Sequence, residues 1–261
     1  SVLNIQGGTF NDFMQAIVVS SVSKVNITGG TFNTDVNAYC ADGYALKLNQ
    51  VTGKYEVGET VATVGGVEYT TIAEAVEAAQ DGDTVTLTAD VELSEGLVIK
   101  KEITLDLAGN TISGAVNDGY GLIYVGTAGN LTITGNGTVE NTDGYAIGSY
   151  GNVTIENGTF TGEYALYNFY YSDTVYGKAT IKGGTFNTNV ATDGLAVANC
   201  GELTIEDGNF GAVVDTTAVL EVNGGTFVEI LTKAPDYDMT SETNINGGSI
   251  DKLTLAVEDG A

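Results

Sequence analysis

Apolar and polar residues alternate in short runs along the chain, and most runs end in the same few residues. The shared pattern is apolar–x–apolar–x, then Gly or Asn, Gly, Thr and Phe. Its copies are LNIQGGTF (3–10), VNITGGTF (25–32), LTITGNGTV (131–139), VTIENGTF (153–160), ATIKGGTF (179–186), LTIEDGNF (203–210), LEVNGGTF (220–227) and TNINGGSI (243–250), with a weaker LDLAGNTI (105–112). Alternation with a period of two is typical of β-strands, because successive side chains of a strand point to opposite faces.

The copies recur at the interval of one solenoid coil. Gly8 and Gly30 are 22 residues apart, and from Gly137 to Gly248 the successive steps are 21, 26, 24, 17 and 23. Further strand-like runs precede the motif in 118–133, 143–155 and 193–205. Stacked coils would satisfy each other's backbone groups through parallel pairing. The sequence therefore predicts an all-β, right-handed parallel β-helix with about three short strands per coil of ~22 residues.

Stacking also predicts which side chains point inward. One inner column pair comprises Leu131/Ile133, Val153/Ile155, Ala179/Ile181, Leu203/Ile205 and Leu220/Val222, and a second column comprises Phe160, Phe186, Phe210 and Phe227. The glycine before each Thr-Phe would permit the positive φ that a sharp corner needs. On the outside, a threonine ladder is expected at Thr104, Thr132, Thr154, Thr180 and Thr204.

The chain is predicted to consist of two solenoid pieces. Residues 1–60 read as the last coils of a preceding β-helix with a hairpin cap, whose turn lies at 51–54. Residues 61–261 read as a second β-helix that begins with a capping helix at 71–80. Thr70 or Thr71 can cap that helix, with Glu74 in the capping-box position to Thr71. Because Ser1 falls in the middle of a repeat, we expect a processed chain or a fragment.

The stretch VGGVEYTTIAEAVEAAQDGDTVTLTADVEL (64–93), together with LVIKKEITLDLAGNTISG (97–114), resembles the start of pectate-lyase-like right-handed β-helix domains. Such domains occur in surface proteins of gut Firmicutes and in some phage structural proteins. The stretch at 29–57 is similar to the terminal motif of the same repeats. The resemblance extends over essentially the whole chain and implies the fold, but the superfamily includes lyases, hydrolases, adhesins and virion parts.

The charge of the chain excludes several classes of function. There are 34 acidic residues against nine basic ones, giving −25, and all nine are Lys because Arg and His are absent. Such a surface repels nucleic acids and anionic lipids, so we expect no nucleic-acid binding. No run approaches the ~18 apolar residues that a membrane helix needs, so we expect no membrane insertion. Polysaccharide lyases of the resembled superfamily typically use an Arg or Lys base. Lys182 is the candidate base, but it lies between Glu156 and Glu206 in what reads as a charge-alternating ladder, so no catalytic residue is assigned.

An aromatic-rich segment at 164–176 is the candidate ligand-binding site. Tyrosine rings backed by polar side chains are typical of sugar or protein recognition. The candidate residues are Tyr167, Tyr170, Tyr171, Asp173 and Tyr176. The alternative is that half of these rings point into the core and the rest cover an inserted loop.

Asp-Gly turns recur at equivalent places and can hold Ca²⁺ through carboxylate and carbonyl oxygens. The candidate metal ligands are Asp118, Asp143 and Asp193, and Asp42 precedes a similar turn. Ordinary turn chemistry is the alternative. Cys40 and Cys200 are too far apart for a disulfide framework and are interpreted as small buried side chains.

The features above predict a non-catalytic, extracellular structural or adhesive module at a cell or virion surface. Its expected partner is a host glycan or protein surface, or other surface or virion subunits. The alternatives are a phage virion component, such as a capsid fibre or tail protein, and a carbohydrate-active lyase or hydrolase.

Overall fold

The chain folds as a parallel β-solenoid of about ten turns, as predicted, with 58% of the described residues in strands and 4% in helix. The computed structural model describes residues 2–11, 24–234 and 241–256. Two compact units are formed, the first by residues 1–79 with 87–89, the second by 80–86 with 90–261. Residues 12–23 of the predicted first solenoid piece lie outside the described residues.

The first unit contains a four-stranded sheet in the order β1-β2-β4-β3. Its strands are β1 (Val2–Phe10), β2 (Lys24–Phe32), β3 (Tyr44–Asn49) and β4 (Lys54–Glu59), with a short 3-10 helix, η1 (Asn37–Tyr39). Strands β1 and β2 pair in parallel as successive coils, and Phe10 stacks on Phe32 at 4.8 Å. Strands β3 and β4 form the predicted hairpin, and β4 pairs antiparallel with the edge of β2.

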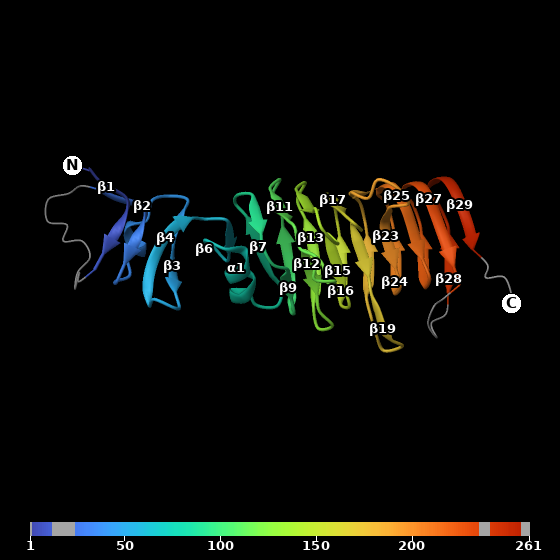
Figure 1. The fold of residues 1–261 in the computed structure, drawn as a ribbon, viewed down its shortest axis with the longest axis horizontal. Coiled ribbons are helices and arrows are strands. Elements are labelled where there is room, and N and C mark those ends of the chain that lie inside the picture. The colour runs from blue at the N-terminus through green and yellow to red at the C-terminus, as the bar shows by residue number, and fades with distance from the viewer. Residues whose placement is uncertain (1, 12–23, 235–240, 257–261) are drawn as a thin grey trace. The chain divides into compact units, whose positions relative to one another are not determined.

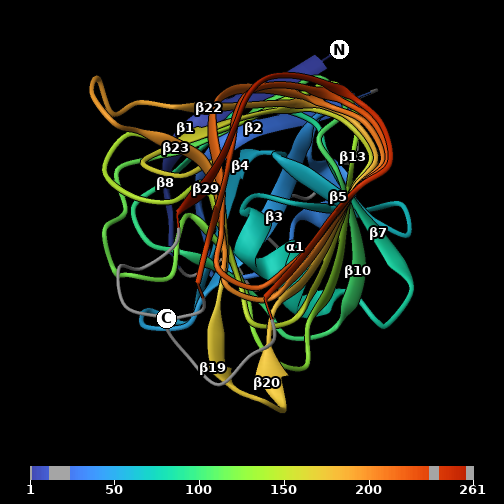
Figure 2. The same ribbon diagram turned by 90° about the vertical axis from the view of Figure 1, so that its right-hand side faces the viewer.

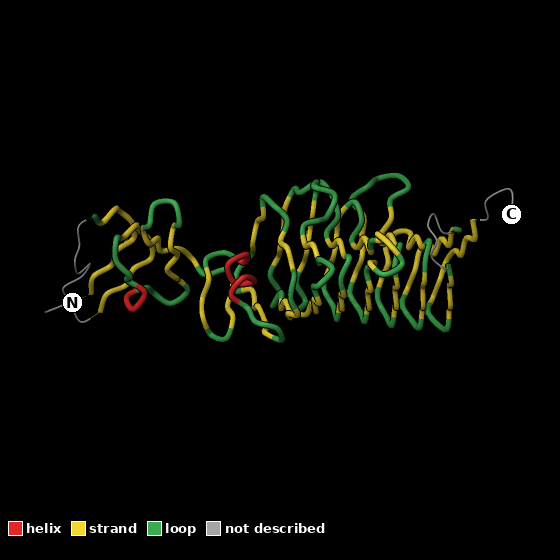
Figure 3. The backbone as a smooth tube through the Cα atoms, turned by 90° about the horizontal axis from the view of Figure 1, so that it is seen from below, coloured by secondary structure: helices red, strands yellow, loops and turns green. Residues whose placement is uncertain are grey.

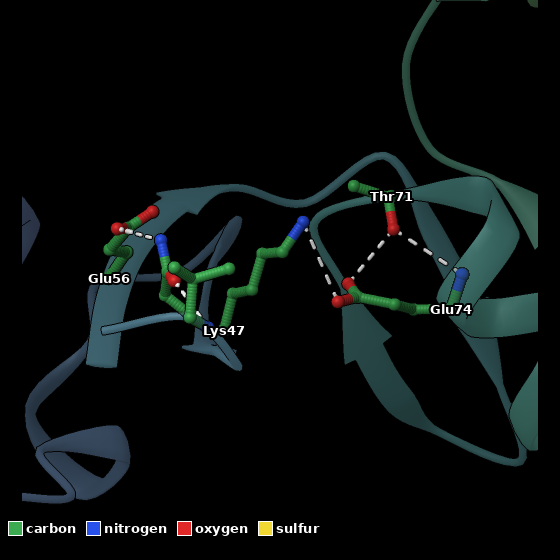
Figure 4. Close-up of polar contacts among 6 residues, drawn as sticks. Lys47, Glu56, Thr71 and Glu74 are labelled. Atoms are coloured by element: carbon green, nitrogen blue, oxygen red, sulfur yellow. Dashed lines mark hydrogen bonds and ion pairs between the residues drawn. The ribbon is translucent and has the colours of Figure 1, made fainter. Parts of the chain in front are cut away.

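The predicted helix, α1 (Ile72–Ala78), follows an antiparallel strand pair, β5 (Ala62–Val64) and β6 (Val67–Tyr69). Thr71 is its N-cap, since the Thr71 hydroxyl oxygen accepts from the backbone N–H of Glu74 at 3.3 Å. Figure 4 shows the Glu74 side chain turned back to Thr71, where its carboxylate accepts from the hydroxyl at 2.9 Å. The apolar face predicted from the helical spacing is buried.

The second unit is built from three rows of parallel strands, one from each side of the coil. The first row contains β7 (Asp83–Leu87), β10 (Glu102–Asp106), β13 (Asn130–Thr134), β16 (Asn152–Ile155), β21 (Lys178–Ile181), β24 (Glu202–Ile205), β26 (Val219–Val222) and β28 (Glu242–Ile245). The second contains β8 (Val91–Leu93), β11 (Thr111–Gly114), β14 (Thr138–Asn141), β17 (Thr159–Gly162) and β22 (Thr185–Thr188). The third contains β9 (Leu97–Ile99), β12 (Ile123–Val125), β15 (Ile147–Ser149), β18 (Leu166–Asn168) and β23 (Leu195–Asn199).

The predicted three short strands per coil are found up to β23, but the last coils have fewer and longer strands. There the second and third rows merge into single long strands, β25 (Asn209–Thr216), β27 (Thr226–Lys233) and β29 (Ser249–Ala256). Only 17 residues separate Gly208 from Gly225, so this coil has too few residues for a separate corner. The bend becomes a register shift between Phe210 and Val213. Figures 1 and 3 show the successive coils of this unit and the turns between their strands.

The predicted inner columns are confirmed. The aliphatic pairs of the first row lie in register across β13, β16, β21, β24 and β26, and each is at most 4% exposed. Phe160, Phe186, Phe210 and Phe227 are fully buried, and neighbouring rings stack at 5.2, 5.0 and 4.6 Å. The corner glycine has the expected positive φ in most copies of the motif, for example 107° at Gly184. Gly137 is the exception, and in that coil Gly135 has the positive φ. The threonine ladder also lies in register on the outer face.

A buried polar ladder ends the third row, and the sequence patterns did not predict it. Ser149, Asn168, Asn199 and Thr216 occupy equivalent positions in successive coils and are at most 1% exposed. The Asn168 amide donates to the Asn199 side-chain oxygen at 2.8 Å, and the Asn199 amide donates to the Thr216 hydroxyl at 3.0 Å. The amides of Asn168 and Asn199 also donate to the backbone oxygens of Glu202 and Val219, each at 2.9 Å, because a buried corner leaves backbone groups without strand partners. The Asn168 side-chain oxygen is buried and has no hydrogen-bond partner in the described part of the chain.

Candidate functional site

Seven aromatic rings gather around the outer side of β12, β15 and β18. This set, named the aromatic face, comprises Tyr120, Tyr124, Tyr145, Tyr150, Tyr164, Tyr167 and Phe169. Strand alternation accounts for it, because Ile123 and Val125 point into the core and leave Tyr124 on the outer side. Tyr124, Gly148 and Tyr167 occupy one outward column of three successive coils.

The rings form one continuous network across three coils. Tyr145 stacks on Tyr164 at 5.1 Å and meets the edge of Tyr167 at 5.0 Å. Tyr150 stacks on Phe169 at 4.7 Å and lies 6.4 Å from Tyr124. These are the separations at which aromatic pairs attract one another, so the rings are held in place before any ligand arrives.

Gly148 leaves the space that this network needs. A Cβ at this position would lie 2.7 Å from the Phe169 ring and 1.8 Å from the backbone oxygen of Tyr120. Phe169 is therefore able to lie over the strand, where it is only 7% exposed. The five outer tyrosines Tyr124, Tyr145, Tyr150, Tyr164 and Tyr167 remain partly exposed.

Three hydroxyls of the aromatic face, those of Tyr124, Tyr145 and Tyr164, have a raised pKa, which favours their neutral form. Burial raises the pKa of Tyr124, and also that of Tyr145, where the charge of Glu163 adds to the effect. Burial likewise raises the pKa of Tyr164, again with a contribution from Glu163. Neutral tyrosine hydroxyls both donate and accept hydrogen bonds, which suits recognition of other hydroxyl groups.

The predicted ligand residues occupy different places. Tyr167 belongs to the aromatic face, whereas Tyr170, Tyr171 and Asp173 belong to a hairpin inserted after β18, formed by β19 (Tyr170–Ser172) and β20 (Val175–Tyr176). Figure 2 shows this hairpin projecting from the coils. The Tyr170 hydroxyl donates to Asp173 at 2.7 Å, and Tyr171 is 76% exposed.

Tyr176, the fifth predicted residue, closes the hairpin against the next coil. Its hydroxyl donates to Glu202 at 2.6 Å, and the Lys178 ammonium lies 5.0 Å from its ring centroid and 2.8 Å from Glu202. Burial acts to raise the pKa of Glu202, but the hydrogen bonds from Lys178 and Tyr176 outweigh it and hold that pKa below 4.5. These contacts anchor the hairpin base.

Sequence reasoning missed four members of the aromatic face, namely Tyr120, Tyr124, Tyr145 and Tyr150. It searched for aromatic density within one stretch, whereas these rings come from two earlier coils. A signal was present, because Asp-Gly-Tyr occurs at both 118–120 and 143–145. Aligning the coils would have placed these tyrosines beside Tyr164 and Tyr167.

The three candidate metal ligands lie in turns of different coils. Asp118 accepts from the backbone N–H groups of Tyr120 at 2.8 Å and Gly121 at 3.1 Å, as an Asx turn does. Asp193 adopts a positive φ of 56° in its turn, and Asp143 is exposed. Among the described residues, no group of three or more Asp, Glu, Cys or His side chains is placed to hold a metal ion.

The candidate catalytic and redox side chains have structural surroundings. Lys182 forms an ion pair with Glu156 at 2.8 Å on the outer ladder. Cys40 and Cys200 form no disulfide, and each is partly buried. Burial, with Asp35 and Glu68 nearby, raises the pKa of Cys40, so this thiol stays protonated.

A cavity of about 630 Å³ in the first unit lies between the hairpin β3–β4 and the segment 66–74. On its wall, the Lys47 ammonium reaches Glu74 at 3.6 Å, as Figure 4 shows. Both side chains are more than a third exposed, so this ion pair contributes little to stability.

The longest helix in the described part of the chain has seven residues, too few to span a membrane. Comparison with known proteins finds no matching family model, no matching curated protein and no matching solved structure. The assignment of this chain as a parallel β-solenoid therefore comes from its own repeats and from the structure they form.

Proposed function

We propose that this chain is a non-catalytic, extracellular structural and adhesive module that binds a glycan on its aromatic face. The observation that supports this most directly is the network of tyrosine rings on the outside of β12, β15 and β18. Aromatic faces pack against the C–H faces of sugar rings, while tyrosine hydroxyls exchange hydrogen bonds with sugar hydroxyls.

The rigidity of the network favours binding. Each ring already packs on a neighbour, and the strands beneath are fixed by ladders on both sides. Little side-chain freedom is therefore lost when a ligand arrives, and lost freedom is a main cost of association. The charge of −25 repels anionic polysaccharides, so the favoured ligand is an uncharged glycan.

The non-catalytic and extracellular parts of the proposal rest on composition and resemblance. His, the most frequent general base, is absent, and so is the Arg that related lyases use. Lys182, the candidate base, is paired with Glu156. The repeats resemble pectate-lyase-like domains of bacterial surface proteins, in which stacked coils make a stalk. The same resemblance includes virion proteins and carbohydrate-active enzymes, and no feature of the described residues favours either over adhesion.

A glycan array that also monitors product release tests this proposal. The wild-type chain is expected to bind neutral glycans without turnover, and Tyr145→Ala and Tyr124→Ala are expected to weaken binding. Tyr171→Ala, on the exposed hairpin, is the matched control and should bind normally. If only Tyr171→Ala lost binding, the glycan site would lie on the hairpin and not on the aromatic face. If the array detected released product, the chain would be an enzyme and the proposal of a non-catalytic module would be wrong.

A further inference from the structure

Beside the aromatic face, outward side chains of the last coils enclose a cavity of about 500 Å³. We name it the acidic groove, and its polar residues are Glu163, Tyr164, Asp193, Asp215, Glu229 and Lys233. Its floor comes from β23, β25 and β27, and its rim includes the turn that contains Asp193. The groove shares Tyr164 with the aromatic face.

Asp215 is the unusual member of the groove. It occupies an outward position on β25, between Ala198 and Leu231 of the adjacent coils, yet it is only 8% exposed. One carboxylate oxygen accepts from the Lys233 ammonium at 2.5 Å. The other oxygen, Oδ1, is buried and has no hydrogen-bond partner in the described part of the chain. An unpaired buried carboxylate oxygen is costly, so a donor that reached it would gain a strong hydrogen bond.

The charge of the groove selects the kind of donor. Four carboxylates line it, from Glu163, Asp193, Asp215 and Glu229, against the single ammonium of Lys233, so four minus one leaves a net charge of −3. Glu229 forms an ion pair at 2.8 Å with Lys252, a residue that does not line the groove. The remaining excess of negative charge attracts a cation. Because the described residues contain no group of three acids spaced for a metal ion, the acids fit a longer organic cation better.

The apolar walls indicate the rest of the ligand. Leu195, Val213 and Leu231 line the groove between the carboxylates. Methylene groups of an aliphatic chain would pack on them, and a cation can also lie over the ring of Tyr164. We propose that the acidic groove binds an ammonium or guanidinium group on an aliphatic chain, with Asp215 as its principal acceptor. This chemistry is supplied by a Lys or Arg side chain of a partner protein or by a free polyamine.

Calorimetric titration of the full chain tests the proposal, with spermidine, a short Arg-containing peptide and the same peptide with uncharged citrulline as probes. We expect spermidine or the Arg peptide to bind, and the citrulline peptide not to bind. Asp215→Asn keeps the shape of the side chain but removes its charge, and should weaken binding about 10- to 100-fold. Glu206→Gln, at an exposed acid that directly follows β24, is the matched control and should bind as the wild type does.

Lys233→Met provides a second variant, because it removes the internal ammonium that competes for Asp215. It should bind the same cation more tightly, which a merely unfolded variant could not do. If spermidine binds and the Arg peptide does not, the ligand is a free polyamine. If the Arg peptide binds and spermidine does not, the ligand is a side chain of a partner protein. Equal affinities in the wild type and Asp215→Asn, or no binding of either cation, would refute the proposal. Glycan binding by the aromatic face is a separate measurement, so either proposal can fail alone.

Discussion

The phenylalanine column offers the sharpest test of how the solenoid is stabilised. Phe186 is fully buried and stacks between Phe160 at 5.2 Å and Phe210 at 5.0 Å. Replacing it by Ala removes the buried ring and leaves a cavity, since the backbone ladders on both sides prevent collapse. Burial and cavity terms for such a change amount to about 3–5 kcal/mol, and the loss of two ring contacts favours the upper half of that range.

Because each coil contacts only its neighbours, the damage from Phe186→Ala should be local. Urea unfolding followed by far-UV circular dichroism would measure the total loss. Hydrogen exchange read by mass spectrometry would show the largest increase in β17, β22 and β25, with less change in β10 and β11. Phe186→Leu refills most of the space and should cost less than about 1.5 kcal/mol.

Tyr171→Ala is the control for removal of an aromatic ring, because Tyr171 is 76% exposed and its loss should change stability by less than about 0.5 kcal/mol. A loss below about 1 kcal/mol for Phe186→Ala would show that the column is not a packed core. An equal increase of exchange in every coil would show that stability is not distributed coil by coil.

Three further predictions concern a glycine within a strand, the buried polar ladder and the base of the hairpin. Gly148→Ala places a Cβ 1.8 Å from a backbone oxygen and should cost about 3 kcal/mol in thermal unfolding, whereas Gly126→Ala, with no atom nearer than 3.6 Å, should change little. Asn199→Ala removes the centre of the polar ladder and orphans several buried groups, so it should cost about 2–4 kcal/mol, and a neutral result would contradict the ladder's role. Glu202, whose pKa in the fold is below 4.5, should stabilise the hairpin base above pH 4.5 and lose this effect as the pH falls through its folded-state pKa. Hydrogen exchange in β19 and β20 should therefore rise with acid in the wild type, and Glu202→Gln should flatten this pH dependence.

The sequence by itself determined the strands, their register and the inner columns. Alternation with a period of two decides which side chains of a strand share a face, and the recurring Gly-Thr-Phe places the same corner in every coil. Phe160, Phe186 and Phe210 could therefore be assigned to one column without coordinates. The helix at 72–78 was also predictable, because its cap and its apolar spacing are local features.

Only the tertiary structure decided what gathers on the outside of the coils. Tyr167 was found from its own segment, but Tyr124 and Tyr145 became its neighbours through the stacking of three coils. The merging of strands in β25 depends on how few residues remain for a corner, and it brings Asp215 and Lys233 together. Whether two outward side chains of successive coils come into contact depends on the insertions, corners and bulges of each coil. The distance between such side chains is therefore set by the stacking of the coils, and a local sequence pattern does not predict it.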